Sequence, residues 1–214
     1  IIALLVVILL LTSKLWRVRK DLWTLAVIVG IGIIAQAIVG GITVWTGLNP
    51  FIVGFHYVSS LLLVCVSAAF LMRMDEPGGP RVLAVPRWYA GLTHFTAAVL
   101  AVSIAFGVLT TGAGPHSGDT ESGRNGFDAT LLEHVHAWPG YALLALTIVL
   151  VAIAWVQQLP TRNWGIALLA AQFVQVAIGL YQARNGLPVL AVGIHMVLAA
   201  LTAAAMTLFI LRMK

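Results

Sequence analysis

The sequence predicts an all-α membrane protein built from two four-helix bundles related by a pseudo-twofold axis along the membrane normal, with the first helix and part of the second absent. Of its 214 residues, 61% are hydrophobic and only 9% are charged, whereas soluble domains carry about a quarter charged residues. Apolar runs of bilayer-spanning length recur along the chain. An internal repeat also relates the first part of the chain to the last. Lipid is therefore the expected solvent for most of the surface.

The chain divides into seven apolar segments separated by short polar stretches. Their ranges are 1–13, 22–45, 50–72, 88–111, 133–158, 163–183 and 188–212. The first segment is too short to cross a bilayer, and its basic residues follow the apolar run, whereas those of a signal peptide precede it. We therefore expect a chain that starts in the middle of a helix.

Basic residues gather on one side of the predicted membrane. The turns after the first, third and fifth segments and the C-terminal end contain Lys14, Arg17, Arg19, Lys20, Arg73, Arg81, Arg87, Arg162, Arg212 and Lys214. The opposite side has Arg124 and Arg184. This asymmetry predicts that the basic side faces the cytoplasm, and all seven tryptophans fall at segment ends, as in an interfacial belt. We expect a multi-pass protein of the bacterial plasma membrane, and cations placed at membrane flanks argue against nucleic acid as the partner.

A gapless repeat with a period of 139 residues relates the segments at the two ends of the chain. Residues that recur in this register include Trp16 and Trp155, Gln36 and Gln175, Gly40 and Gly179, and His56 and His195. The period contains four spans, an even number, so both halves have the same orientation and an axis along the membrane normal relates them. The expected division is an incomplete N-terminal half, residues 1–80, and a C-terminal half, residues 81–214.

Three histidines lie at matching depths near the predicted outer ends of their segments. His56 is six residues past Pro50, His195 is seven past Pro188, and His136 opens the fifth segment. At 1.5 Å per residue, His56 and His195 lie roughly 10 Å below the outer surface. Two neutral imidazoles that face each other across a bundle core can ligate a six-coordinate haem iron.

A structural role is the alternative for these histidines, since they could hydrogen-bond between helices or line a polar cavity. Ionisable side chains at membrane depth more often mark functional sites, and the recurrence of His56 as His195 strengthens that interpretation. Zinc is disfavoured because no Asp, Glu or Cys accompanies them at the same depth. The predicted metal ligands are therefore His56, His136 and His195.

Glu133 precedes His136 by three residues and shares its helix face. It either accepts a hydrogen bond from the second ring nitrogen of His136 and orients that ligand, or it caps the start of the helix. Both alternatives stay open. His134 points about 200° away from His136 on a helix, so only one of the two rings faces the bundle.

The remaining candidate residues carry weaker signals. His94 lies near the cytoplasmic end of its segment and is expected to be structural, while His116 lies in the polar outer loop 112–132. Arg124 and Arg184 are the outer cations and could pair with haem propionates. The lone cysteine, Cys65, excludes an intramolecular disulfide and is expected to be a small buried hydrophobe.

Four runs of sequence resemble the haem A synthase family. They are GGITVWTGLNPFIVGFH (40–56), TGAGPHSGD (111–119), HVHAW (134–138) and LPVLAVGIH (187–195). In that family they correspond to the stretch before the histidine of the fourth helix, the outer loop after the fifth helix, and the ligand segments of the sixth and eighth helices. The family's eight helices in two halves agree with the repeat.

The resemblance implies an enzyme that oxidises a methyl group of haem O to a formyl group, making haem A for terminal oxidases. It implies a haem b held between His136 and His195, and haem O as the substrate in the N-terminal half with His56 as one ligand. The second ligand there would precede Ile1 by about three residues. His56 and Glu133 are the candidate catalytic residues. The outer loop lacks the paired cysteines that many family members carry.

Two other classes of protein remain alternatives. A membrane di-haem b electron-transfer cytochrome without catalytic activity would share the paired histidines. A transporter with parallel repeats would share the symmetry, but the sequence has no charged residue in the centre of a span. The expected partners are haem O, the lipid bilayer, and haem O synthase or the terminal oxidase assembly, and self-association is left open.

Overall fold

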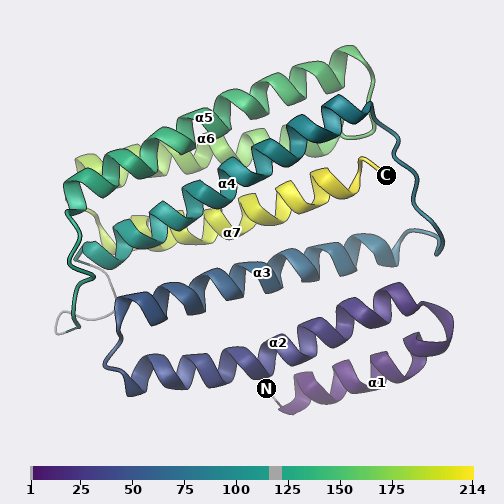
Figure 1. The fold of residues 1–214 in the computed structure, drawn as a ribbon, viewed down its shortest axis with the longest axis horizontal. Coiled ribbons are helices and arrows are strands. Elements are labelled where there is room, and N and C mark those ends of the chain that lie inside the picture. Colours follow the sequence, from purple (N-terminus) through teal and green to yellow (C-terminus); the bar gives the residue numbers. More distant parts are fainter. Residues whose placement is uncertain (1, 116–121) are drawn as a thin grey trace.

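The computed structural model describes residues 2–115 and 122–214, and in these residues it contains seven helices and no strand (Figure 1). The helices are α1 (Ile2–Val18), α2 (Lys20–Trp45), α3 (Pro50–Met74), α4 (Arg87–Ala113), α5 (Ala129–Val156), α6 (Arg162–Arg184) and α7 (Val189–Leu211). Six of them, α2 to α7, are long and apolar enough to cross a membrane. The prediction of an all-α membrane protein is therefore confirmed.

The helices expose large apolar side chains along much of their length. Phe55 and Leu62 on α3 are both 62% exposed, and Leu190 on α7 is 76% exposed. In water such faces would be unfavourable, because burial of apolar surface is the main force that stabilises a soluble fold. Their exposure fits a multi-pass protein whose outer faces contact lipid tails.

Helices α4 to α7 form a closed four-helix bundle, in which each helix packs on the next and α4 also packs on α7 (Figure 1). Its core contains the fully buried side chains of Tyr89, Leu150, Leu168 and Phe209. Helix α3 packs against α7 and α4, α2 packs on α3, and α1 packs on α2. The first three helices thus form a row beside the bundle, and the boundary expected near residue 80 falls in the stretch between α3 and α4.

Two segments differ from their expected bounds by more than two residues. Helix α1 continues to Val18, and α5 begins at Ala129, four residues before the expected start. The carboxylate of Asp128 causes the earlier start of α5, because it accepts hydrogen bonds from the backbone N–H groups of Thr130 and Leu131 at 2.8 and 3.0 Å. His136 therefore lies two turns inside the helix and does not open it.

The repeat is visible in the backbone of two turns that are 139 residues apart. Leu48, between α2 and α3, has a φ of 58°, and Leu187, between α6 and α7, has a φ of 56°. The N–H of Leu48 donates to the carbonyl of Thr43 at 2.8 Å, and that of Leu187 donates to Gln182 at 2.9 Å. A glycine with positive φ precedes each leucine. Both turns therefore reverse the chain by the same left-handed geometry.

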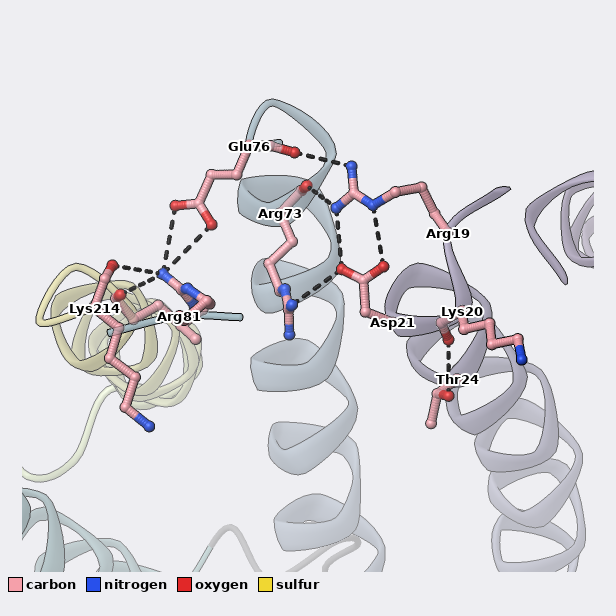
Figure 2. A network of polar contacts seen from close by, with 9 residues as sticks. Arg19, Lys20, Asp21, Thr24, Arg73, Glu76, Arg81 and Lys214 are labelled. Carbon is pink, nitrogen blue, oxygen red and sulfur yellow. Dashed lines mark hydrogen bonds and ion pairs between the residues drawn. The ribbon is translucent and has the colours of Figure 1, made fainter. Parts of the chain in front are cut away.

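A network of ion pairs and hydrogen bonds links the helix ends on the side of the molecule that carries most of the basic residues (Figure 2). The Arg19 guanidinium donates two hydrogen bonds of 3.0 Å to the Asp21 carboxylate, and these bonds raise the pKa of Arg19. Arg19 also donates to the carbonyls of Arg73 and Glu76, and the Arg73 guanidinium lies 3.0 Å from Asp21. The turn between α1 and α2 is thereby fastened to the end of α3.

Arg81 extends this network to the end of α7. Its guanidinium lies 3.4 Å from the Glu76 carboxylate and donates to the backbone carbonyls of Leu211 and Lys214 (Figure 2). Helices α3 and α7 are therefore joined here through the stretch that precedes α4. We call this end of the molecule the basic end.

Candidate functional site

The structure brings His136 of α5 and His195 of α7 together at the end of the bundle opposite the basic end. Their ring centroids are 6.2 Å apart and the ring planes are inclined by 82°. Both side chains are half-buried. Both helices begin at this end, and each of the two histidines lies about two turns inside its helix.

A backbone carbonyl of α4 orients the His136 ring. The ring Nδ1 lies 2.9 Å from the carbonyl oxygen of Ser103. A carbonyl oxygen only accepts hydrogen bonds, so Nδ1 carries the proton and Nε2 keeps a free lone pair. This is the tautomer that a metal-ligating histidine needs.

Glu133 does not contact the His136 ring in the described structure. Its side chain is exposed on the first turn and a half of α5, and Asp128, not Glu133, caps the helix. Of the two alternatives left open for Glu133, neither is realised, because Ser103 takes the orienting role and Asp128 takes the capping role.

His195 retains an unused hydrogen-bonding group. In the part of the chain that the structure describes, its buried Nδ1 has no hydrogen-bond partner. Gln175 of α6 donates from Nε2 to the backbone carbonyl of His195 at 3.1 Å, which fixes the backbone of this turn. Buried polar atoms without a partner are uncommon in folded proteins and call for an explanation, such as a bound group.

His56 lies two turns inside α3 and is also half-buried, with its Nδ1 buried and without a partner among the described residues. Gln36 of α2 donates to the hydroxyl of Ser59 at 2.8 Å and accepts from Ser60 at 3.2 Å. The Ser60 hydroxyl lies 2.8 Å from the His56 carbonyl and shares its single proton between this oxygen and Gln36. The Ser59 hydroxyl lies 3.1 Å from the same carbonyl and 2.7 Å from that of Phe55. Gln36 therefore supports His56 through two serines, whereas Gln175, its equivalent in the repeat, contacts the His195 carbonyl directly.

Each of the three rings lies against a glycine of the preceding helix. A β-carbon would lie 2.9 Å from Cε1 of His136 at Gly107, 3.1 Å from Cε1 of His195 at Gly179, and 3.4 Å from Cε1 of His56 at Gly40. Because real β-carbons almost never approach closer than about 3.0 Å, a larger residue at Gly107 would force the His136 ring to shift. Sequence reasoning noticed Gly40 and Gly179 as repeat-related but did not connect them with the histidines.

The other candidate residues do not join this pair of histidines. His134 is exposed, and its Nδ1 lies 2.8 Å from the carbonyl of Thr130 in its own helix. Arg124 folds back onto its own loop and donates to the carbonyls of Ser122 and Pro115. Arg184 is exposed at the end of α6.

Two further histidines lie elsewhere. His94 is exposed on the second turn of α4, near the basic end, and His116 lies outside the described residues. Cys65 is partly exposed in the middle of α3 and has no disulfide partner, because it is the lone cysteine.

In comparisons with known proteins, no family model, curated protein or solved structure matches the chain. Among residues 2–115 and 122–214, no group of three or more His, Cys, Asp or Glu side chains is placed to hold a metal ion. The site is therefore a pair of imidazoles from two helices. Such a pair lacks the four ligands of a structural zinc site, whereas two imidazoles can act as the axial ligands of a six-coordinate haem iron.

Proposed function

We propose that this protein is a haem-binding membrane oxidoreductase of the haem A synthase type, which oxidises the methyl group of haem O to a formyl group. The observation that carries the proposal is the close approach of the His136 and His195 rings. If each imidazole nitrogen is about 2 Å from one metal ion, the ring centroids are roughly 6 Å apart. The observed spacing of 6.2 Å agrees with that value.

The chain's own residues prepare the two imidazoles for an iron. The Ser103 carbonyl holds the His136 ring in the tautomer with a free Nε2. Gly107 and Gly179 let the rings pack against α4 and α6, which limits their rotation. A bound haem b would supply redox-active iron, a chemistry that side chains alone do not provide.

The substrate is assigned to the N-terminal helices, with His56 as a ligand. Its buried Nδ1 has no partner among the described residues, and its support through Gln36 parallels that of His195 through Gln175. Haem O is an apolar molecule with a polar edge, so the bilayer is its natural source. On this proposal haem O synthase supplies the substrate and terminal oxidase assembly receives the product.

The proposal is tested with the full chain expressed in cells that make haem O. The purified protein is examined by a reduced-minus-oxidised spectrum and by pyridine haemochrome analysis, and its pigments are separated. We expect a low-spin haem b signal together with accumulating haem A. Haem b without haem A would indicate the electron-transfer cytochrome, and the absence of haem would return the histidines to a structural role.

A matched pair of histidine variants tests the site itself. We expect His195→Ala to remove the low-spin haem signal, while His94→Ala, at the basic end, retains it. If His195→Ala kept the signal, the assignment of this ligand would be wrong. Circular dichroism of both variants separates loss of the ligand from loss of the fold.

A further inference from the structure

A cleft of about 360 Å³ opens at the basic end, far from the three half-buried histidines. It is formed by the end of α3, the stretch before α4, the second turn of α4 and the end of α7. Four nitrogen-bearing side chains line it: Arg73, Arg81, His94 and Lys214. Leu83, Ile210 and neighbouring apolar side chains form the rest of the wall.

The charge of this cleft is only partly neutralised within the protein. Arg81 pairs with Glu76, and Arg73 pairs with Asp21. In the part of the chain that the structure describes, the Lys214 ammonium and the His94 ring have no hydrogen bond, and Lys214 extends away from the Arg81 guanidinium (Figure 2). Ten basic residues but only three acidic ones, Asp21, Asp75 and Glu76, lie in the segments that meet at this end. An anion would offset the excess positive charge.

The surroundings of the cleft identify the kind of anion. It lies where membrane-spanning helices end, and its wall is partly apolar. Leu71 and Val82, close in sequence to the lining arginines, are 64% and 79% exposed. A soluble anion gains nothing from apolar surface, whereas a phospholipid places its phosphate among the cations and its acyl chains along the helices.

We propose that the cleft is a binding site for the phosphate of an anionic phospholipid headgroup. The lipid would cover the junction between α3, α4 and α7 that Arg81 holds together. Its binding is independent of the haem function, because the cleft lies at the basic end, whereas His56, His136 and His195 lie near the opposite ends of their helices.

The proposal is tested with the full chain in a neutral detergent by native mass spectrometry and thermal unfolding. The added probes are phosphatidylglycerol, phosphatidylcholine and inorganic phosphate. We expect phosphatidylglycerol to stay bound and to raise the unfolding temperature more than phosphatidylcholine does. Inorganic phosphate at the same concentration should have no effect. If inorganic phosphate raised the unfolding temperature as much as phosphatidylglycerol does, the ligand would not be a lipid. If the protein retained the two lipids equally, the cleft would not be an anion-binding site.

Charge variants locate the lipid within the basic end. Lys214→Gln should weaken phosphatidylglycerol binding roughly fivefold, the effect of one cation near an anionic headgroup, and Lys214→Arg should retain it. Arg162→Gln is the matched control, because Arg162 lies at the start of α6 over the Trp155 ring and does not line the cleft. If Arg162→Gln weakened binding as much as Lys214→Gln, the lipid would be held by the overall positive charge of the surface, and the proposed cleft would be wrong.

Discussion

The hydroxyl of Tyr57 on α3 donates a 2.8 Å hydrogen bond to the backbone carbonyl of Met196 on α7, a residue one full repeat of 139 positions away. In an interface with twofold symmetry, equivalent positions approach each other at the axis. The Tyr57–Met196 contact is the kind of contact that a pseudo-twofold axis between α3 and α7 would produce. It also explains why α3, and not α1 or α2, packs against the bundle.

Tyr57→Phe should loosen the contact between the two halves. The substitution removes one hydrogen bond at the axis and leaves the ring in place, so we expect a loss of about 1 kcal/mol in the free energy of unfolding. For a chain of this length that is a fall of roughly 2–4 °C in the unfolding temperature. Tyr141→Phe is the control, because Tyr141 is 49% exposed. An equal fall in both variants would contradict a special role for the Tyr57 hydroxyl.

Asp128→Ala should unwind the first turn of α5, the helix that carries His136. The variant loses both N-capping hydrogen bonds, which costs about 1 kcal/mol. Hydrogen exchange of the amides of Thr130 and Leu131 measures the effect locally. Asp128→Asn keeps the capping oxygen and should exchange as the parent protein does; faster exchange in that variant would point to the negative charge instead.

The basic end should face the cytoplasm, since positively charged flanks remain there during insertion. The measurement uses a Cys65→Ser background with a single new cysteine at Pro77→Cys, between α3 and α4, or at Gly123→Cys, between α4 and α5. Both positions are exposed. An impermeant maleimide should label residue 123 in intact cells and residue 77 only after lysis. If residue 77 were labelled in intact cells and residue 123 only after lysis, the predicted topology would be wrong.

Much of the fold was predictable because long apolar runs identify membrane helices from local sequence alone. The recurrence of Gln36, Gly40 and His56 one repeat later predicted matched environments, and the identical turns at Leu48 and Leu187 agree with it. The start of α5 was misplaced although Asp128 is a common N-capping residue. The four residues that follow the cap, 129–132, were assigned to the polar outer loop, although three of them are apolar.

The details of the site depended on contacts that no sequence pattern displays. The Ser103 carbonyl is a main-chain group, so no residue type signals its hydrogen bond to His136. Gly107, which lies against the same ring, has no recurrence within the chain because its repeat equivalent would precede Ile1. Glu133 was a candidate because of its spacing from His136, but its side chain is exposed.

The contact between Gly107 and His136 yields the most direct test of the site. In Gly107→Ala the new β-carbon would lie 2.9 Å from the ring Cε1 and 3.2 Å from Nδ1. The ring must then move, and it loses its hydrogen bond to the Ser103 carbonyl. Loss of such an orienting contact typically lowers metal affinity by about 10- to 100-fold. We therefore expect Gly107→Ala to lose most of its haem during purification, as measured by the ratio of haem to protein.

Gly193→Ala is the matched control for Gly107→Ala, because Gly193 lies in α7 two residues before His195 and a β-carbon there meets no atom within 4 Å. Alanine favours the helix by roughly 0.5–1 kcal/mol over glycine, so this variant should retain haem and unfold at the same or a higher temperature. If Gly107→Ala also retained its haem, the ring would not depend on the glycine contact, and the role assigned to Ser103 would fail with it. If both variants lost haem equally, the effect would come from a general disturbance of the helices, since of these two glycines only Gly107 lies against a histidine ring.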